Sequence, residues 1–233
     1  MRSASLFFLI LAVFIISKRT LAASENEIIY VPIGDSYTIG EGARPEESWP
    51  ALLAKHLNEN GIPLKLVANP ARTGWTTQDA INDELSAFES LHPYFSTLLI
   101  GVNDWVQGVD AGLFRQRLSF LMDKMLETLG DKENLLIVTI PDFSVTPAGS
   151  LYADGRNVHE GIAAFNAIIK EEAAARKLSV IDIYPLSGEM KNDSSLIAKD
   201  GLHPSAKEYA LWEKLIYPVT HDTLSRKIHK EKR

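Results

Sequence analysis

The sequence predicts an α/β fold in which a five-stranded parallel sheet lies between two layers of helices. Five short runs of apolar and β-branched residues recur along the chain, and segments with apolar residues at helical spacing separate them. Strands that are apolar throughout are typical of a parallel sheet covered on both faces. Right-handed crossovers between such strands then produce a three-layer α/β/α sandwich.

The predicted strands are short, and each is bounded by a turn signal. Gly34 and Asp35 follow the first strand, whereas Pro141 and Pro185 stop the last two, because proline cannot donate a hydrogen bond to a sheet. The five predicted strands span residues 28–33, 64–68, 94–101, 134–140 and 178–183.

Helix signals lie between these strands. Thr76 is a good helix cap with acidic residues in the turn that follows, and Gly61 and Gly130 mark helix ends. The predicted helices span residues 49–60, 76–91, 113–129, 159–177 and 205–216. The short basic tail, 225–233, is expected to be a frayed, solvated end.

Length and composition exclude several classes of protein. The chain has 233 residues, of which 45% are hydrophobic and 23% charged, so it can bury a sizeable core and is not disordered, collagen-like or a coiled coil. The net charge of −6 argues against nucleic acid as a partner. Cysteine is absent, which excludes disulfides, a thiolate nucleophile and cysteine-based metal sites.

The N-terminus has the pattern of a secretory signal peptide. An apolar run, 6–16, is too short to span a bilayer and suits a signal-peptide core, with cleavage expected after Ala22. We therefore expect a leader at 1–22, a single domain at 23–233, and a periplasmic or extracellular location. Because Lys18 and Arg19 follow the apolar run, an uncleaved membrane anchor stays open, with membrane contact only through this segment.

Polar residues follow the strands at the edge of the sheet where α/β proteins build their sites. Ser36 lies just after the first strand, and its hydroxyl needs a neighbouring base to act as a nucleophile. His203 is the expected base, with Asp200 three residues earlier to orient its ring and stabilise the imidazolium. The Gly74 N–H, the Asn103 amide and the Ser36 N–H are candidate donors to an oxyanion.

These residues occur in four blocks that resemble the SGNH hydrolases, also called the GDSL esterase/lipase superfamily. The blocks are Gly34-Asp35-Ser36, Gly74, Gly101-x-Asn103-Asp104 and Asp200-x-x-His203-Pro204. The resemblance implies Ser36 as nucleophile, His203 as base, Asp200 as its partner, and Ser36, Gly74 and Asn103 as the oxyanion hole. It also implies a flavodoxin-like sandwich and no cofactor or metal.

The function expected is that of a serine esterase that cleaves carboxylic esters through an acyl-enzyme. The small-molecule substrate is a lipid or an acylated sugar, as in lysophospholipases, acyl-esterases and carbohydrate deacetylases. Tyr37 stands where the family name has leucine, and the aromatic residues near the blocks, Tyr37, Trp75 and Trp105, are candidates to line the substrate pocket.

Three alternatives remain open at this stage. Asp35, Asp104, Asp200 and His203 have the residue types of a metal-dependent phosphoesterase. A non-catalytic binding domain on the same fold is a second alternative. His159, with Asp154 five residues before it, competes with His203 as the base.

Overall fold

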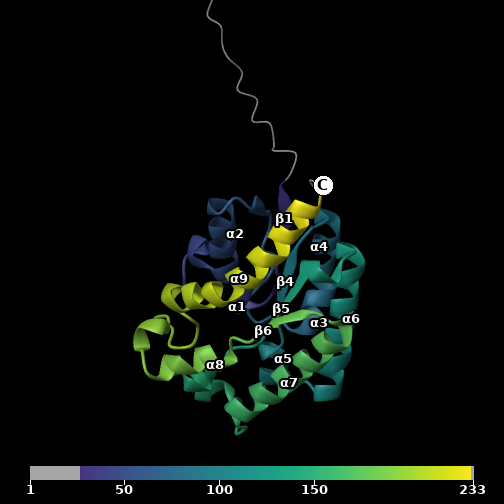
Figure 1. The fold of residues 1–233 in the computed structure, drawn as a ribbon. Coiled ribbons are helices and arrows are strands. Elements are labelled where there is room, and N and C mark those ends of the chain that lie inside the picture. The colour runs from purple at the N-terminus through teal and green to yellow at the C-terminus, as the bar shows by residue number, and fades with distance from the viewer. Residues whose placement is uncertain (1–26, 232–233) are drawn as a thin grey trace, which may run out of the picture.

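A computed structural model describes residues 27–231 and confirms the α/β class, with parallel strands and helices on both sides of them (Figure 1). The predicted leader, 1–22, lies outside the described residues. None of the helices between residues 27 and 231 has the length and apolarity needed to cross a bilayer.

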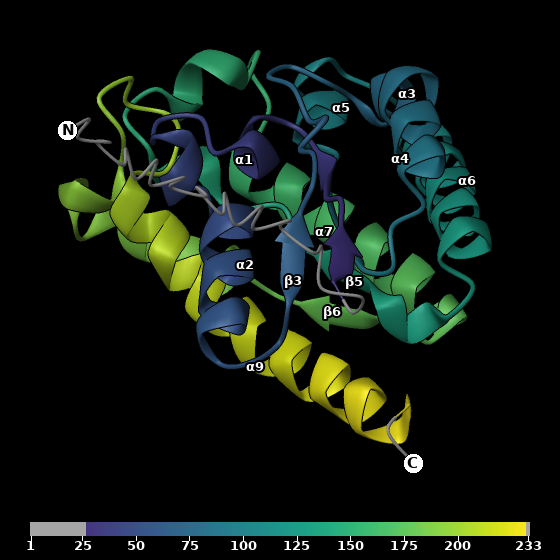
Figure 2. The same ribbon diagram turned by 90° about the horizontal axis from the view of Figure 1, so that it is seen from above.

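Two layers of helices enclose the strands (Figure 2). One layer contains α2 (Trp49–Glu59) and α9 (Ala206–Glu231), which pack against each other. The other contains α4 (Leu85–Leu91), α6 (Ala111–Leu129) and α7 (Val158–Arg176). Asp110 caps the start of α6 with its side chain, and Asn157 caps α7.

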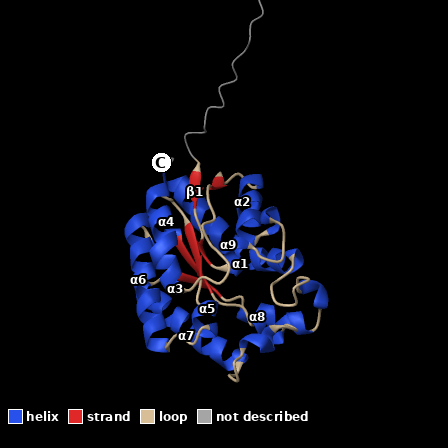
Figure 3. Ribbon diagram, turned by 180° about the vertical axis from the view of Figure 1, so that it is seen from behind, coloured by secondary structure: helices blue, strands red, loops and turns tan. Residues whose placement is uncertain are grey.

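The described strands form two parallel sheets, drawn in red in Figure 3. One sheet pairs β1 with β3, and the other has the order β2-β4-β5-β6. Every residue of the two central strands, β4 and β5, is buried, as expected for the middle of a covered parallel sheet. The strand bounds are β1 Ile28–Tyr30, β2 Ile33–Gly34, β3 Leu64–Leu66, β4 Ser96–Leu99, β5 Leu135–Val138 and β6 Ser179–Ile181.

The prediction of one five-stranded sheet is confirmed only in part. The first predicted strand, 28–33, divides into β1 and β2, with β1 pairing to β3 and β2 pairing to β4. Pro32 lies at the division, where it has no N–H to donate to a neighbouring strand. The two sheets adjoin where Tyr30 and Phe95 form a bridge, and backbone hydrogen bonds link Ile29 and Val31 to the segment before β4.

The predicted helix 76–91 contains an unexpected widened turn. It begins as α3 (Thr77–Asp79), passes through a π-helical turn at Ala80–Glu84, and continues as α4. This turn places Glu84 inside the molecule, where one carboxyl oxygen accepts a hydrogen bond from the Gly34 N–H at 3.0 Å. Turns of this kind are rare and often occur beside functional sites.

The remaining elements are short and lie mainly at the edge of the sheet that carries the predicted site. Two of them, α1 (Ser36–Ile39) and α5 (Val102–Val106), follow β2 and β4 directly. The others are α8 Tyr184–Ser187 and 3₁₀ turns at Pro45–Glu47, Lys132–Asn134, Phe143–Val145, Gly149–Tyr152, Gly188–Lys191 and Ser194–Leu196.

The prediction of a frayed tail is wrong for residues 225–231, because α9 continues to Glu231. The Lys227 ammonium donates to Asp131 at 2.6 Å and to the buried side chain of Asn134 at 2.5 Å. Leu224 on the same helix is fully buried. The basic composition concealed this packing, since a lysine can bury its aliphatic stem while its ammonium binds acceptors.

We expect Lys227→Ala to lower the free energy of unfolding by about 1–3 kcal/mol, because the buried Asn134 oxygen loses its donor. Urea unfolding measures the change. Lys230→Ala, at an exposed position on the same helix, is the control and should change stability little. Equal stability of the two variants would contradict the packing of the tail.

Asp35 begins α1 from a fully buried position. One carboxyl oxygen accepts a hydrogen bond from the Tyr37 N–H at 3.0 Å, and the other finds no partner among residues 27–231. Burial, reinforced by the charge of Asp104, raises the pKa of Asp35 from 3.8 to about 8. Asp35 is therefore a neutral structural acid near pH 7.

A buried acid of this kind makes stability depend on pH. Between its unfolded and folded pKa values, the folded chain holds a proton that the unfolded chain releases, so stability falls as pH rises from about 4 to about 8. We expect Asp35→Asn, which keeps an acceptor for the Tyr37 N–H, to become more stable than the wild type toward pH 8. Urea unfolding at several pH values tests this, with the exposed cap variant Asp110→Asn expected to follow the wild type.

Candidate active site

The turn between β2 and α1 presents Ser36 at the edge of the sheet. Ser36 is the first residue of α1, and 5% of its surface is exposed. Gly34 lies so close to the neighbouring strand that an added Cβ would be 2.3 Å from the Leu99 carbonyl oxygen. Only glycine permits this approach, which brings the Ser36 turn against the end of β4.

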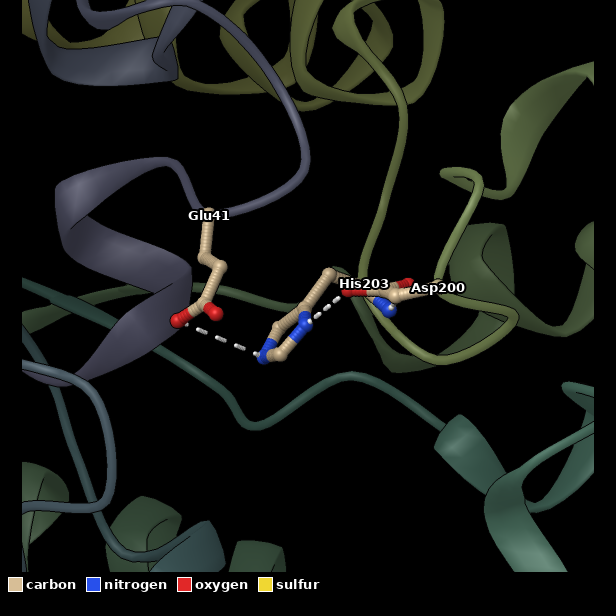
Figure 4. A group of neighbouring side chains, drawn as sticks. All are labelled: Glu41, Asp200 and His203. Carbon is tan, nitrogen blue, oxygen red and sulfur yellow. Dashed lines mark hydrogen bonds and ion pairs between the residues drawn. The ribbon is translucent and has the colours of Figure 1, made fainter.

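The loop before α9 holds His203. Asp200 Oδ2 lies 2.7 Å from His203 Nδ1, and Asp200 Oδ1 accepts the backbone N–H of His203 at 3.0 Å (Figure 4). The ring is therefore fixed from its own loop. Partial burial opposes ionisation of Asp200, but hydrogen bonds from the Leu202 N–H and from His203 outweigh it and hold the pKa of Asp200 below its usual value.

Three of the predicted catalytic and oxyanion-hole residues meet in one small pocket: Ser36, Asn103 and His203. They come from α1, α5 and the loop before α9, which are far apart in the sequence. Asp200 lies behind His203 and is not among the residues that line the pocket. The full lining is Ser36, Tyr37, Val102, Asn103, Val106, Phe143, Tyr152, Leu202 and His203.

Two of the three predicted oxyanion donors, Asn103 and Gly74, occupy adjoining segments. The Asn103 amide donates to the Trp75 carbonyl at 2.9 Å, which ties α5 to the loop that contains Gly74. An amide NH₂ has two N–H bonds, so this contact leaves Asn103 one donor for a ligand. Gly74 is exposed, with φ of +83°, a conformation that favours glycine, and it is not among the pocket-lining residues.

Asp104 braces the same two segments from inside. Its carboxyl oxygens accept the Thr77 N–H at 2.8 Å and the Thr77 hydroxyl at 2.6 Å, and the side chain is fully buried. Burial raises the pKa of Asp104 above its usual value. Asp104 therefore holds α5 against α3 and lies away from the pocket lining.

The three aromatic candidates have different surroundings. The Tyr37 ring lies 5.9 Å from the His203 ring and lines the pocket. Trp105 is only 5% exposed and packs against Phe143, with the Arg156 guanidinium 4.2 Å from its ring centre. Trp75 is half-buried beneath Arg72. Only Tyr37 of the three is among the lining residues.

Glu41 is a site residue that the sequence reasoning missed. Its Oε2 atom lies 3.9 Å from His203 Nε2, on the side of the ring opposite Asp200 (Figure 4). Glu41, Asp200 and His203 each bring one potential ligand atom within 4.8 Å of the others, the one such group found among the described residues. The four metal ligands considered from the sequence included Asp35 and Asp104, which are not part of this group. The position of Glu41, five residues after Ser36, was the only sequence signal.

His159, the competing base, belongs to a different cluster. Its Nδ1 atom lies 2.7 Å from Asp142 Oδ2 and 2.8 Å from the Tyr184 hydroxyl, so its partner is Asp142 and not the predicted Asp154. His159 is not among the residues that line the pocket with Ser36. Ser36 and His203, by contrast, line the same pocket.

Solved structures with the same fold include two esterases and a lipase/acylhydrolase. EstA, a psychrotrophic esterase from Pseudoalteromonas sp. inhibited by monoethylphosphonate, superimposes with a TM-score of 0.68 at 18% identity, over 85% of this chain and 100% of its own. The lipase/acylhydrolase of Enterococcus faecalis gives a TM-score of 0.68 at 23% identity, over 83% and 95%. A family 3 carbohydrate esterase from Clostridium thermocellum gives 0.67 at 22%, over 86% and 98%.

The family assignment rests on a separate comparison. No curated protein matches the chain. The model of the GDSL-like lipase/acylhydrolase family matches residues 33–211, a stretch that begins in β2 and runs through Ser36 and His203 into α9. With this match over most of its length, and with the fold of known esterases, the chain belongs to the GDSL-like lipase/acylhydrolase family and is an ester-hydrolysing enzyme.

Proposed function

We propose that the chain is a serine esterase in which Ser36, His203 and Asp200 form the catalytic triad. One observation carries the proposal: a histidine held by a carboxylate through Nδ1 lines the same small pocket as Ser36. A hydroxyl becomes a useful nucleophile only beside such a base.

The proposed reaction has two stages. His203 Nε2 takes the proton of the Ser36 hydroxyl as the oxygen attacks the ester carbonyl, and Asp200 stabilises the imidazolium. The Ser36 N–H, the Gly74 N–H and the Asn103 amide hold the oxyanion. His203 then gives the proton to the leaving alkoxide, and it later activates water to release the acid from Ser36.

The substrate class proposed is a small carboxylic ester, either a lipid ester or an acylated sugar. Apolar and aromatic side chains of Val102, Phe143, Tyr152 and Leu202 surround the reacting groups, an environment that suits an acyl chain. The carbohydrate esterase among the similar structures supports an acylated sugar. Export directed by residues 1–22 remains a proposal.

Metal-assisted hydrolysis is the second candidate, because Glu41, Asp200 and His203 offer three ligand atoms close together. In that case these three residues would hold a metal ion, which would supply the activation of a water molecule, and Ser36 would have no covalent role. The two mechanisms make opposite predictions for a serine variant and for chelation.

We expect Ser36→Ala to lower kcat/KM for p-nitrophenyl acetate by about 10³-fold or more, because the nucleophile is lost. The measurement compares residues 23–233 of the wild type and the variant, together with labelling by a fluorophosphonate probe. Ser90→Ala, at an exposed helical position, is the matched control and should keep full activity and labelling. Comparable turnover in the wild type and Ser36→Ala would refute the triad.

We expect EDTA to leave the turnover of p-nitrophenyl acetate unchanged, since the proposed mechanism needs no metal. The assay follows the initial rate after dialysis against the chelator and again after addition of Zn²⁺, Mg²⁺ or Mn²⁺. Loss of activity in EDTA that a metal restores would favour the second candidate, with Glu41, Asp200 and His203 as ligands.

A further inference from the structure

His203 lies between two carboxylates, of which the proposed triad uses only one. Asp200 contacts Nδ1 at 2.7 Å, whereas Glu41 Oε2 lies 3.9 Å from Nε2, the nitrogen that faces the chemistry in the proposed function (Figure 4). A distance of 3.9 Å is too long for a hydrogen bond and short enough for a strong charge interaction. Glu41 therefore interacts weakly with a neutral His203 ring and attracts a protonated ring much more strongly.

The backbone of Glu41 is tied to both the nucleophile and α9. Its N–H donates to the Ser36 carbonyl at 2.9 Å, and its carbonyl accepts the Tyr209 hydroxyl at 2.8 Å. At the next residue, Gly42, an added Cβ would be 2.6 Å from Ala198 Cβ and 2.7 Å from the Pro204 carbonyl oxygen. The loop after α1 is thus packed tightly against the loop of His203.

The carboxylate of Glu41 is held as well. The Thr73 hydroxyl donates to Oε2, the same oxygen that faces His203. Thr73 directly precedes Gly74, a proposed oxyanion donor. One carboxylate oxygen consequently contacts the oxyanion loop and faces the base.

We propose that Glu41 is a positioning residue of this esterase, whose fixed negative charge stabilises His203 when the ring takes up the Ser36 proton. The inference rests on the proposed function, because it needs His203 to act as the base. Glu41 offers the protonated ring a second negative charge, on the side opposite Asp200, and it touches neither the nucleophile's oxygen nor the scissile ester.

Among the titratable groups around His203, Glu41 and Asp200 are the ones whose negative charge acts on the ring. Tyr37 from α1 and Tyr209 from α9 stay neutral, because burial holds the pKa of each phenol well above its ordinary value. Tyr152 lines the same pocket from the 3₁₀ turn at Gly149–Tyr152. Asp35, at the start of α1, has a pKa of about 8 and is neutral in the range where a histidine titrates.

The test compares the pH dependence of kcat/KM for p-nitrophenyl acetate in the wild type, Glu41→Gln and Glu41→Asp. On the acid limb of the profile, kcat/KM rises with pH as the base loses its proton. Removing a negative charge that favours the protonated ring therefore moves this limb to lower pH. We expect Glu41→Gln to lower the midpoint of this acid limb by about 0.5 pH unit or more. The expected shift is modest because the carboxylate is partly exposed and water screens its charge. Glu41→Asp should lie between the two.

Two further variants separate charge from structure. Glu59→Gln makes the same charge change at the exposed end of α2 and should leave the midpoint in place. Thr73→Val keeps the Glu41 charge and removes its hydroxyl donor, so we expect a lower kcat with less than half of the midpoint shift of Glu41→Gln. Circular dichroism confirms that each variant is folded.

The outcomes are distinguishable from those of the proposed function. An unchanged midpoint in Glu41→Gln, or an equal shift in Thr73→Val, overturns the role of the Glu41 charge while Ser36-dependent activity stands. A wild type that is as active as Ser36→Ala overturns the proposed function, and the role of Glu41 with it.

Discussion

The pairing of β2 with β4 is the constraint on which the site depends. Gly34 pairs with Leu99, and the two strands run parallel. The segments that follow them therefore leave the sheet side by side at the same edge. Ser36 follows two residues after Gly34, and Asn103 follows four residues after Leu99. The proposed nucleophile and oxyanion donor therefore reach one pocket because of strand register, and the absence of a side chain at Gly34 permits the close approach.

The edge of the sheet is supported by three buried acids that lie outside the pocket lining. Asp35 caps α1, Glu84 accepts the Gly34 N–H, and Asp104 accepts both donors of Thr77. Burial raises the pKa of all three, which means that the fold bears a cost in stability as pH rises. These carboxyls also fix the loops around Ser36, because each accepts a hydrogen bond from a backbone N–H that would otherwise be buried without a partner.

Sequence reasoning placed the strands and most helices well, since their signals are local. Apolar runs mark buried strands, and caps such as Thr76 mark helix starts. It failed where a distant contact decides the outcome. Pro32 lies where the first strand divides between two partners, and Lys227 holds the end of α9 against Asp131 and Asn134, which accept its ammonium. Composition contains no information about such partners.

The sequence by itself determined the α/β class, the family and the identity of Ser36, Asp200 and His203 as candidates, because these depend on local patterns and on residue types in order. Only the tertiary structure decided which side chains meet. It separated His159 from the pocket, turned Glu84 inward and brought Glu41 to the second nitrogen of His203. These contacts join residues 17 to 162 positions apart, and no local pattern encodes which of them meet.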